Sequence, residues 1–207
     1  ETLAAAMVQL SFWKAGRLLV DPCCGSGTIP IEAAMIGRNI APGLNRKFAS
    51  QEWDIIPPEI WKEERKAAFE AIDYDADIRI EASDISGRAV EAAIENAAEA
   101  GVDDCIEFKK MDMARLTAEE EGGIVITNPP YGERIGEKKQ IEAIYSAYNE
   151  FYRKNPTWSL FMVTTDKEVE NKIFGRPADR RRKLYNGRLE VCYYQFHGQK
   201  PSRKQEK

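Results

Sequence analysis

The chain of 207 residues is 43% hydrophobic and 31% charged, with a formal net charge of −4. This length and composition favour a single domain over residues 1–207, with a core large enough to need no disulfide or structural metal. No apolar run approaches the ~20 residues that a membrane-spanning helix needs, and "ETLAAAMVQLSFWKAG" (1–16) is typical of an amphipathic helix, not of a signal peptide.

The next unit of the chain is a strand, a glycine-rich turn and a helix. "RLLV" (17–20) predicts the strand, "DPCCGSGT" (21–28) the turn and "IPIEAAMIG" (29–37) the helix. Gly25 and Gly27 would let the backbone pass close to a ligand held at the helix N-terminus. The turn lacks the third glycine of a dinucleotide site and the Gly-Lys-Ser/Thr of a P-loop. It favours a small nucleoside- or carboxylate-bearing ligand, with an ordinary tight turn as the alternative.

Residues 38–77 interrupt the alternation of strands and helices and are predicted to be an insertion near the edge of the site. The insertion holds a helix over 58–72 ("PEIWKEERKAAFEAI"). Arg46, Phe48 and Trp53 combine a cation with aromatic rings, as a loop that stacks on bases or grips phosphates would. The alternative is that the two aromatic side chains only pin the insertion onto the core.

Two aspartates follow the next two predicted strands. "IRIEAS" (78–83) and "CIEFKK" (105–110) predict strands, and the helix over 86–101 lies between them. Asp84 is placed to accept hydrogen bonds from both hydroxyls of a ribose, and Asp112 from an adenine amino group. Both are also common helix-capping residues, which is the alternative reading.

An unusual box ends the fourth predicted strand, "GIVIT" (123–127). The box is "NPPY", in which two prolines restrict the backbone and hold the neighbouring carbonyls in defined directions. The Asn128 Oδ1 and the Pro129 carbonyl are acceptors for the two hydrogens of an exocyclic amino group, and Tyr131 is available to stack on the base. An ordinary loop is the alternative.

The last third of the chain predicts a helix (137–155) and a buried strand (158–165), followed by two strands (181–187 and 188–196). Asn186–Gly187 between these two strands is a strong hairpin signal. Alternating strands and helices that end in a hairpin predict an α/β fold. Its Rossmann-like sheet has seven strands, mostly parallel, with a terminal antiparallel pair. The hairpin and the missing third glycine disfavour a dehydrogenase.

Charge is unevenly distributed along the chain. Residues 172–207 hold 11 Lys or Arg and 3 Asp or Glu, so residues 1–171 carry the balance of −12. The basic end, with "RPADRRRK" at 176–183, would suit phosphate groups. The alternative is a solvated face, and residues 198–207 are predicted to be a flexible tail.

Cysteine and histidine are too sparse and badly spaced for a metal site. There is one histidine, His197, and no Cys-x-x-Cys pair. We therefore predict no metal ion, reduced thiols and a cytoplasmic location. The four cysteines are Cys23, Cys24, Cys105 and Cys192.

Taken in order, these motifs resemble those of class I S-adenosylmethionine-dependent methyltransferases that act on a planar exocyclic nitrogen. The motifs are "DPCCGSGT" (21–28), "SDIS" (83–86), "MDM" (111–113) and "NPPYGER" (128–134). Two longer segments, "APGLNRKFASQEW" (41–53) and "KLYNGRLEVCYYQF" (183–196), resemble the guanine-N2 methyltransferases of 23S ribosomal RNA. Members of that group are also called N6-adenine DNA methylases.

The resemblance implies S-adenosylmethionine as cofactor and a role for each matching residue. The methionine end would meet Thr2, Asp21, Gly25 and Gly27, with Cys24 lining the turn. Asp84 would bind the ribose and Asp112 the adenine. The target base would meet Asn128, Pro129 and Tyr131.

Two departures from the family pattern bear on the substrate. Family members usually carry an N-terminal THUMP domain that binds RNA, and this chain has none, while residues 1–171 are acidic. The expected substrate is RNA, with ribosomal RNA as the leading candidate. We therefore expect much of the affinity for RNA to lie in an N-terminal domain outside this chain. The alternatives are guanine-N2 methylation of transfer RNA, adenine-N6 methylation of DNA, or a non-catalytic module that binds cofactor or RNA.

Overall fold

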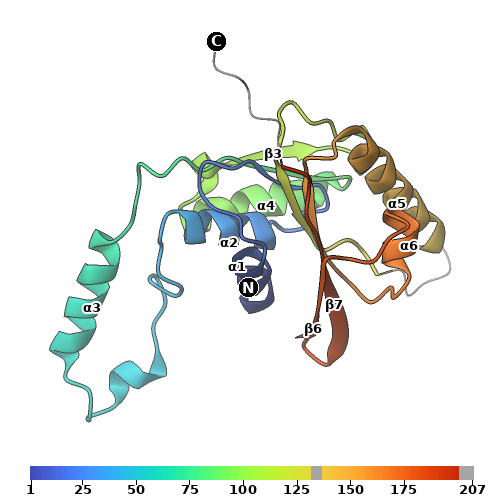
Figure 1. Cartoon of the computed structure of the whole chain (residues 1–207). Helices are drawn as coiled ribbons and strands as arrows, with labels where there is room; N and C mark the ends of the chain where they lie inside the picture. The colour runs from blue at the N-terminus through green and yellow to red at the C-terminus, as the bar shows by residue number, and fades with distance from the viewer. Residues whose placement is uncertain (132–136, 201–207) are drawn as a thin grey trace.

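The computed structural model describes residues 1–131 and 137–200. Residues 201–207 of the predicted tail and 132–134 of the segment after the box lie outside this description. The described residues form one seven-stranded sheet in the order β3-β2-β1-β4-β5-β7-β6 (Figure 1). The strands are β1 (Leu19–Asp21), β2 (Ile80–Asp84), β3 (Ile106–Lys110), β4 (Ile124–Thr127), β5 (Ser159–Thr164), β6 (Arg180–Asn186) and β7 (Leu189–Phe196).

The sheet is parallel from β3 to β5 and antiparallel at its other edge. β7 pairs antiparallel with β5, and β6 pairs with β7 through a hairpin in which Asn186 lies opposite Leu189. Gly187 in the turn has a φ of 61°, which favours glycine because it has no Cβ. The predicted fold class, with its mostly parallel sheet and terminal antiparallel hairpin, is confirmed.

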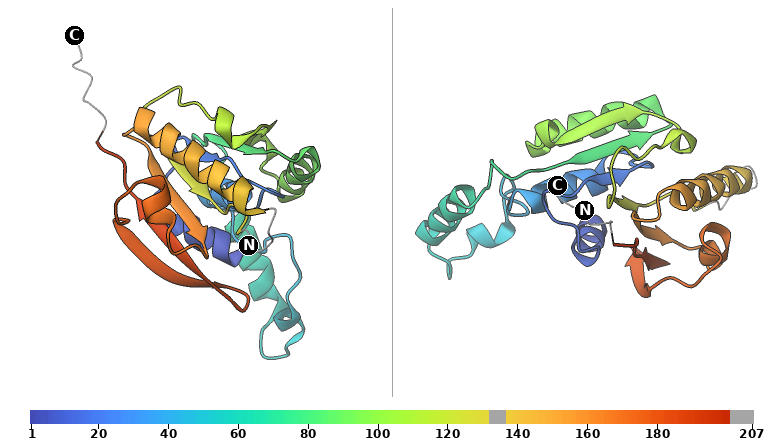
Figure 2. Two further views of the ribbon diagram at one scale, coloured as in Figure 1. Left: turned by 90° about the vertical axis from the view of Figure 1, so that its right-hand side faces the viewer. Right: turned by 45° about the horizontal axis from the view of Figure 1, so that its top comes forward.

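Helices cover both faces of the sheet (Figure 2). Residues of α1, α2 and α4 pack in one hydrophobic cluster and residues of α5 and α6 in another. The strands alternate between the two clusters, as Ile124 and Ile126 face the first and Val125 the second. The helices are α1 (Thr2–Leu10), α2 (Thr28–Gly37), α3 (Pro58–Glu70), α4 (Gly87–Ala100), α5 (Glu137–Lys154) and α6 (Val169–Ile173), with 3₁₀ turns η1 (Ala49–Glu52), η2 (Asp103–Cys105) and η3 (Met113–Arg115).

Helix boundaries follow local signals where these exist. The Ser86 hydroxyl accepts a hydrogen bond from the Ala89 backbone N–H (3.4 Å) at the start of α4, and Gly101 ends the helix with a φ of 71°. The largest differences from prediction concern an early helix end and a missed helix. The N-terminal helix ends at Leu10, because Phe12 adopts a φ of 62° that no helix continues through. The short helix α6 was not predicted, because its five residues give too little periodicity.

Residues 38–77, here called the arm, begin against the body, where Ile40 packs on the first hydrophobic cluster, and then extend away from the two layers of helices. The arm carries α3, which has no buried residue, and Figure 1 shows it beside the body of the molecule, not on the sheet. Within the arm, Phe48 stacks on Trp61 with ring centroids 5.8 Å apart. Helix α3 is mostly polar and has one weakly apolar face. Such a helix can pack that face against a neighbouring loop without entering a core.

Candidate active site

The glycine turn after β1 is tied to the ends of two strands. The Cys23 backbone N–H donates to Asp21 Oδ1 (3.2 Å), and the Gly25 N–H donates to Asp84 Oδ2 (3.1 Å). Asp84 Oδ1 also accepts from the Ser86 N–H (2.9 Å). The carboxylates that end β1 and β2 therefore hold the turn at the carboxyl edge of the sheet, where ligands bind in open α/β folds.

Gly27 meets a tighter constraint than Gly25, although both have positive φ. A Cβ at Gly27 would lie 3.0 Å from the Ala93 Cβ on α4, whereas a Cβ at Gly25 would meet no atom of the described residues within 4 Å. Gly27 precedes the first residue of α2, so its small size lets α2 approach α4 closely. Gly27 is therefore needed for the packing of α2 on α4, whereas Gly25 is not packed against another described element.

This contrast predicts that Gly27→Ala costs more stability than Gly25→Ala. Gly27→Ala should cost roughly 1–3 kcal/mol because it adds both backbone strain and overpacking against α4. Gly25→Ala should cost only about 1 kcal/mol of backbone strain. Urea unfolding of both variants measures the difference, and equal losses would contradict the role given to Ala93.

Asp21 is the most deeply buried carboxylate at this edge. Asp21 is 1% exposed, and its Oδ2 has no hydrogen-bonding partner within residues 1–131 and 137–200. Burial raises the pKa of Asp21 to about 7, and the Thr127 side chain and the Cys23 N–H partly oppose the shift. A buried oxygen without a partner is costly, so this atom is suited to receive a donor, preferably cationic, from a ligand.

The Asn-Pro-Pro-Tyr box leaves the sheet directly after β4. Asn128 is exposed, Pro129 is buried, and the Tyr131 ring packs at the margin of the first hydrophobic cluster. The Tyr131 hydroxyl is buried and has no hydrogen-bonding partner among the residues that the structure describes. Burial raises the pKa of Tyr131, and the side chains of Asn186 and Asn128 lie near enough to oppose that shift without forming a well-aligned hydrogen bond. The phenol therefore stays protonated and keeps its O–H as a hydrogen-bond donor.

A cleft of about 320 Å³ joins the glycine turn to the box. It is large enough for a ligand of nucleoside-cofactor size to enter in part. Four segments meet there: the start of α1, the glycine turn with the start of α2, the end of β4 and the tip of the β6–β7 hairpin. The lining residues are Glu1, Leu3, Ala4, Met7, Asp21, Cys23, Cys24, Gly25, Ser26, Thr28, Ile29, Asn128 and Asn186.

The predicted site residues fall into two groups. Asp21, Cys24, Gly25 and Asn128 line the cleft, and Asp84 holds the turn that forms its wall. Gly27, Thr2, Asp112, Pro129 and Tyr131 are not among the lining residues. Asp112 caps η3, where its Oδ1 accepts from the Ala114 N–H at 2.9 Å.

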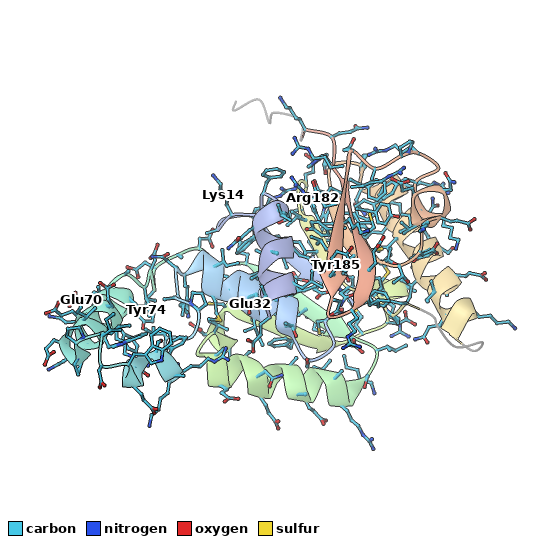
Figure 3. All side chains as sticks on the ribbon, turned by 90° about the horizontal axis from the view of Figure 1, so that it is seen from below. Lys14, Glu32, Glu70, Tyr74, Arg182 and Tyr185 are labelled. Atoms are coloured by element: carbon cyan, nitrogen blue, oxygen red, sulfur yellow. The ribbon has the colours of Figure 1, made fainter. Side chains whose placement is uncertain are left out.

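The three predicted substrate residues of the insertion lie on the arm. Arg46 reaches Glu1, which lines the cleft, at 3.5 Å in an exposed ion pair. Phe48 packs against Trp61, and Trp53 is 59% exposed, so neither ring is packed into the core of the domain. Figure 3 shows Glu70 and Tyr74 farther out on the arm, away from the hairpin that carries Tyr185.

Asn186 is a cleft residue that the sequence motifs did not reveal. The Asn186–Gly187 pair predicts the hairpin, and the structure confirms it, but the turn signal says nothing about where the tip points. No local pattern could have paired it with Asn128, because the two residues meet only through the order and twist of the sheet.

Metal-binding clusters and membrane-spanning helices are absent from residues 1–131 and 137–200. No group of three or more His, Cys, Asp or Glu side chains is arranged to hold a metal ion there. No helix in these ranges has the length and apolar character to cross a membrane.

A parallel sheet with a terminal hairpin, and a cleft between a glycine turn and an Asn-Pro-Pro-Tyr box, define the class: this is a Rossmann-like methyltransferase domain. Residues 1–195 match the model of the family UPF0020, described as RMKL-like, methyltransferase domain. The chain belongs to this family.

Known relatives agree with this assignment. The chain is 47% identical over 205 residues to "Putative RNA methyltransferase YpsC" of Bacillus subtilis (strain 168), covering 99% of the chain and 53% of that protein. It is 38% identical over 199 residues to "Ribosomal RNA large subunit methyltransferase K/L" of Shewanella baltica (strain OS185), covering 93% of the chain and 28% of that protein. The chain therefore spans about half or less of these relatives.

A solved structure shares the fold closely. It is described as "SMU.472, a putative methyltransferase complexed with SAH", and superposes with a TM-score of 0.91 and 45% identity. The match covers 97% of this chain and 53% of the other.

Proposed function

We propose that this domain transfers a methyl group from S-adenosylmethionine to the exocyclic N2 of a guanine in large-subunit ribosomal RNA. The cleft carries the proposal, because it joins the unpartnered Asp21 carboxylate oxygen to Asn128 of the Asn-Pro-Pro-Tyr box. Family membership supports the reaction class. The name of the Shewanella relative supports the RNA, and the SAH in the SMU.472 structure supports the cofactor.

Residues of the glycine turn fit a nucleoside that carries an amino acid. Asp21 Oδ2 would accept from the ammonium group of the cofactor, which removes the cost of leaving this oxygen unpaired. Gly25 lets the backbone approach the ligand, and Asp84 and Asp112 would accept from the ribose hydroxyls and the adenine amino group. Thr2 and Cys24 would complete the wall near the methionine end.

The box would activate the amino group of the base. The Asn128 Oδ1 and the Pro129 carbonyl accept its two hydrogens and draw the nitrogen toward a tetrahedral, nucleophilic geometry. The cofactor supplies an electrophilic methyl group on a sulfonium sulfur that leaves as a neutral thioether. The N–C bond forms as the S–C bond breaks, and one amino proton leaves through these acceptors to water. Tyr131 would stack on the base, which must be extruded from its helix or loop.

The remaining contacts with RNA are proposed to be divided between the domain and the rest of the protein. Arg46, Phe48 and Trp53 extend along the arm, where an exposed ring and a cation suit a single-stranded segment. Residues 1–171 carry a net charge of −12. We therefore assign most of the RNA affinity to an N-terminal RNA-binding domain of the full-length protein.

Calorimetric titration of the protein with S-adenosylmethionine, S-adenosylhomocysteine and NAD tests the cofactor. Binding of the first two and not of NAD supports the proposal. Labelled methyl transfer to unmodified transcripts of large-subunit ribosomal RNA, with transfer RNA and duplex DNA as controls, then tests the substrate. Binding without transfer to any RNA, or transfer to DNA alone, would overturn it.

The raised pKa of Asp21 predicts that cofactor affinity depends on pH. The ionised carboxylate attracts an ammonium group far more strongly than the neutral acid does, so affinity should fall by up to about tenfold per pH unit below a pKa of about 7. The amino group of the cofactor itself titrates at about 7.7–8.0, so the comparison belongs at about pH 6 and pH 7.5. Calorimetry measures the change.

A fragment of the cofactor provides the control for this prediction. 5′-Methylthioadenosine has no amino group, so its affinity should not change between the two pH values. An equal change for both ligands would show that the pH acts on the fold and not on Asp21.

A further inference from the structure

The tip of the β6–β7 hairpin reaches the cleft from the far edge of the sheet. β6 is the edge strand and is separated from β4 by β5 and β7, yet Asn186 lines the same cleft as Asn128 and Asp21. Asn186 is exposed at the cleft, and within the described residues no well-aligned hydrogen bond ties its amide to the neighbouring Tyr131 hydroxyl. An amide at this place is free to meet a ligand.

The position of the tip is set by contacts along the strands behind it. The Tyr193 hydroxyl donates to the Met7 carbonyl of α1 (2.6 Å), and Gln195 Nε2 donates to the Leu10 carbonyl (3.2 Å). Leu184 packs at the margin of the same hydrophobic cluster as Tyr131. The hairpin is therefore anchored to α1, whose first residues line the cleft, and Asn186 is held on a rigid element.

The Tyr131 hydroxyl marks the place where a polar partner is missing. It is buried and forms no well-aligned hydrogen bond with any described residue, although the amides of Asn128 and Asn186 both lie near it. Few buried polar groups in proteins lack a partner, so this hydroxyl is placed to orient one of the two amides at the margin of the cleft. Asn128 is already assigned to the amino group, which leaves Asn186 without a role.

We propose that Asn186 recognises the edge of the target base next to its amino group and thereby selects guanine. This inference rests on the proposed function. A carboxamide offers one acceptor and two donors. Beside its N2 amino group guanine presents the N1–H donor and then the O6 acceptor, which match the Asn186 Oδ1 and Nδ2. Adenine presents only ring-nitrogen acceptors beside N6, so it could use the donor alone.

The surroundings of the tip suit the rest of a nucleotide. Tyr185 is 57% exposed, with the Lys183 Nζ 5.4 Å from its ring centroid, and Arg188 follows the turn. Figure 3 shows Tyr185 on the hairpin beside α1. Arg188 forms no ion pair with any described residue. A cation and an exposed ring next to the base-reading amide are placed for phosphate and stacking contacts.

The test compares Asn186→Ala with Leu189→Ala in the full-length protein. Leu189 lies opposite Asn186 in the hairpin and is 37% exposed, so its truncation disturbs the same turn without removing an amide. Methyl transfer is measured on a transcript of Bacillus subtilis 23S ribosomal RNA. Asn186→Ala should lower kcat roughly 10- to 100-fold, as expected for loss of a bidentate contact. It should leave S-adenosylhomocysteine affinity unchanged, and Leu189→Ala should stay near wild type.

A second measurement reads base preference directly. Saturation-transfer NMR on the S-adenosylhomocysteine-loaded protein compares GMP with AMP, and wild type should favour GMP while Asn186→Ala should not. Unchanged kcat, equal losses in both variants, or an unchanged GMP preference in Asn186→Ala would overturn the role of Asn186. Absence of methyl transfer by wild-type protein that binds the cofactor would instead overturn the proposed function.

Discussion

Replacing Asn128 with alanine should abolish methyl transfer while leaving cofactor affinity near wild type. The Asn128 Oδ1 is one of two acceptors proposed for the amino group, and it acts as charge develops on the nitrogen. Loss of one such preorganised group is expected to lower kcat by at least about 10²-fold. Single-turnover transfer of labelled methyl to the RNA, with calorimetry of S-adenosylhomocysteine binding, measures both quantities.

Two further variants make the Asn128 result specific. Asn128→Asp keeps an acceptor oxygen at the same place and should retain part of the activity. Asn155→Ala removes an amide from the end of α5, where its Nδ2 donates to the Phe151 carbonyl (2.9 Å), and should leave kcat unchanged. Equal loss of turnover and cofactor binding in Asn128→Ala would remove this residue from the chemistry.

The second large effect is expected at Asp21, where asparagine should weaken cofactor binding without weakening the fold. The substitution keeps an acceptor for the Cys23 N–H but removes the charge that would meet the ammonium group. Hydrogen bonds to charged groups predict a roughly 10- to 100-fold loss of affinity. The loss should disappear for 5′-methylthioadenosine, and calorimetry with both ligands measures it.

The same variant should be at least as stable as wild type at pH 8. Burial raises the folded-state pKa of Asp21 to about 7, whereas the pKa in the unfolded state is about 4. The contribution of this carboxyl group to the stability of the fold is therefore lost as pH rises from about 4 to about 7. Above pH 7 the wild type bears the whole cost of a buried charge, which asparagine lacks. Thermal melts at pH 4.5 and 8 test this, with exposed Asp103→Asn as the control. Destabilisation at pH 8 would contradict it.

The predictions for Asn128 and Asp21 concern the carboxyl ends of two strands that were predicted from the sequence. Short apolar runs before Asp21 and Asn128 predicted β1 and β4 because strand periodicity, prolines and glycines act on neighbouring residues. The hairpin at Asn186–Gly187 was predicted for the same reason, since a tight turn needs backbone angles that these residues adopt readily.

The tertiary structure alone decided which side chains are buried and which distant segments lie close together. The sequence does not show that Asp21 is fully buried with a raised pKa, because that follows from the layers packed around β1. Nor does it show that the insertion stands apart as an arm, where α3 buries no residue. A helix with a weak apolar face packs according to what lies beside it.

By itself, the sequence determined the order of the elements, the fold class, the glycine turn and the box, because each depends on residues close together in the chain. Only the tertiary structure decided that Asn186 lies in the cleft with Asn128. The two strands between β4 and β6 and the twist of the sheet bring Asn186 and Asn128 together, and no local sequence preference encodes this approach.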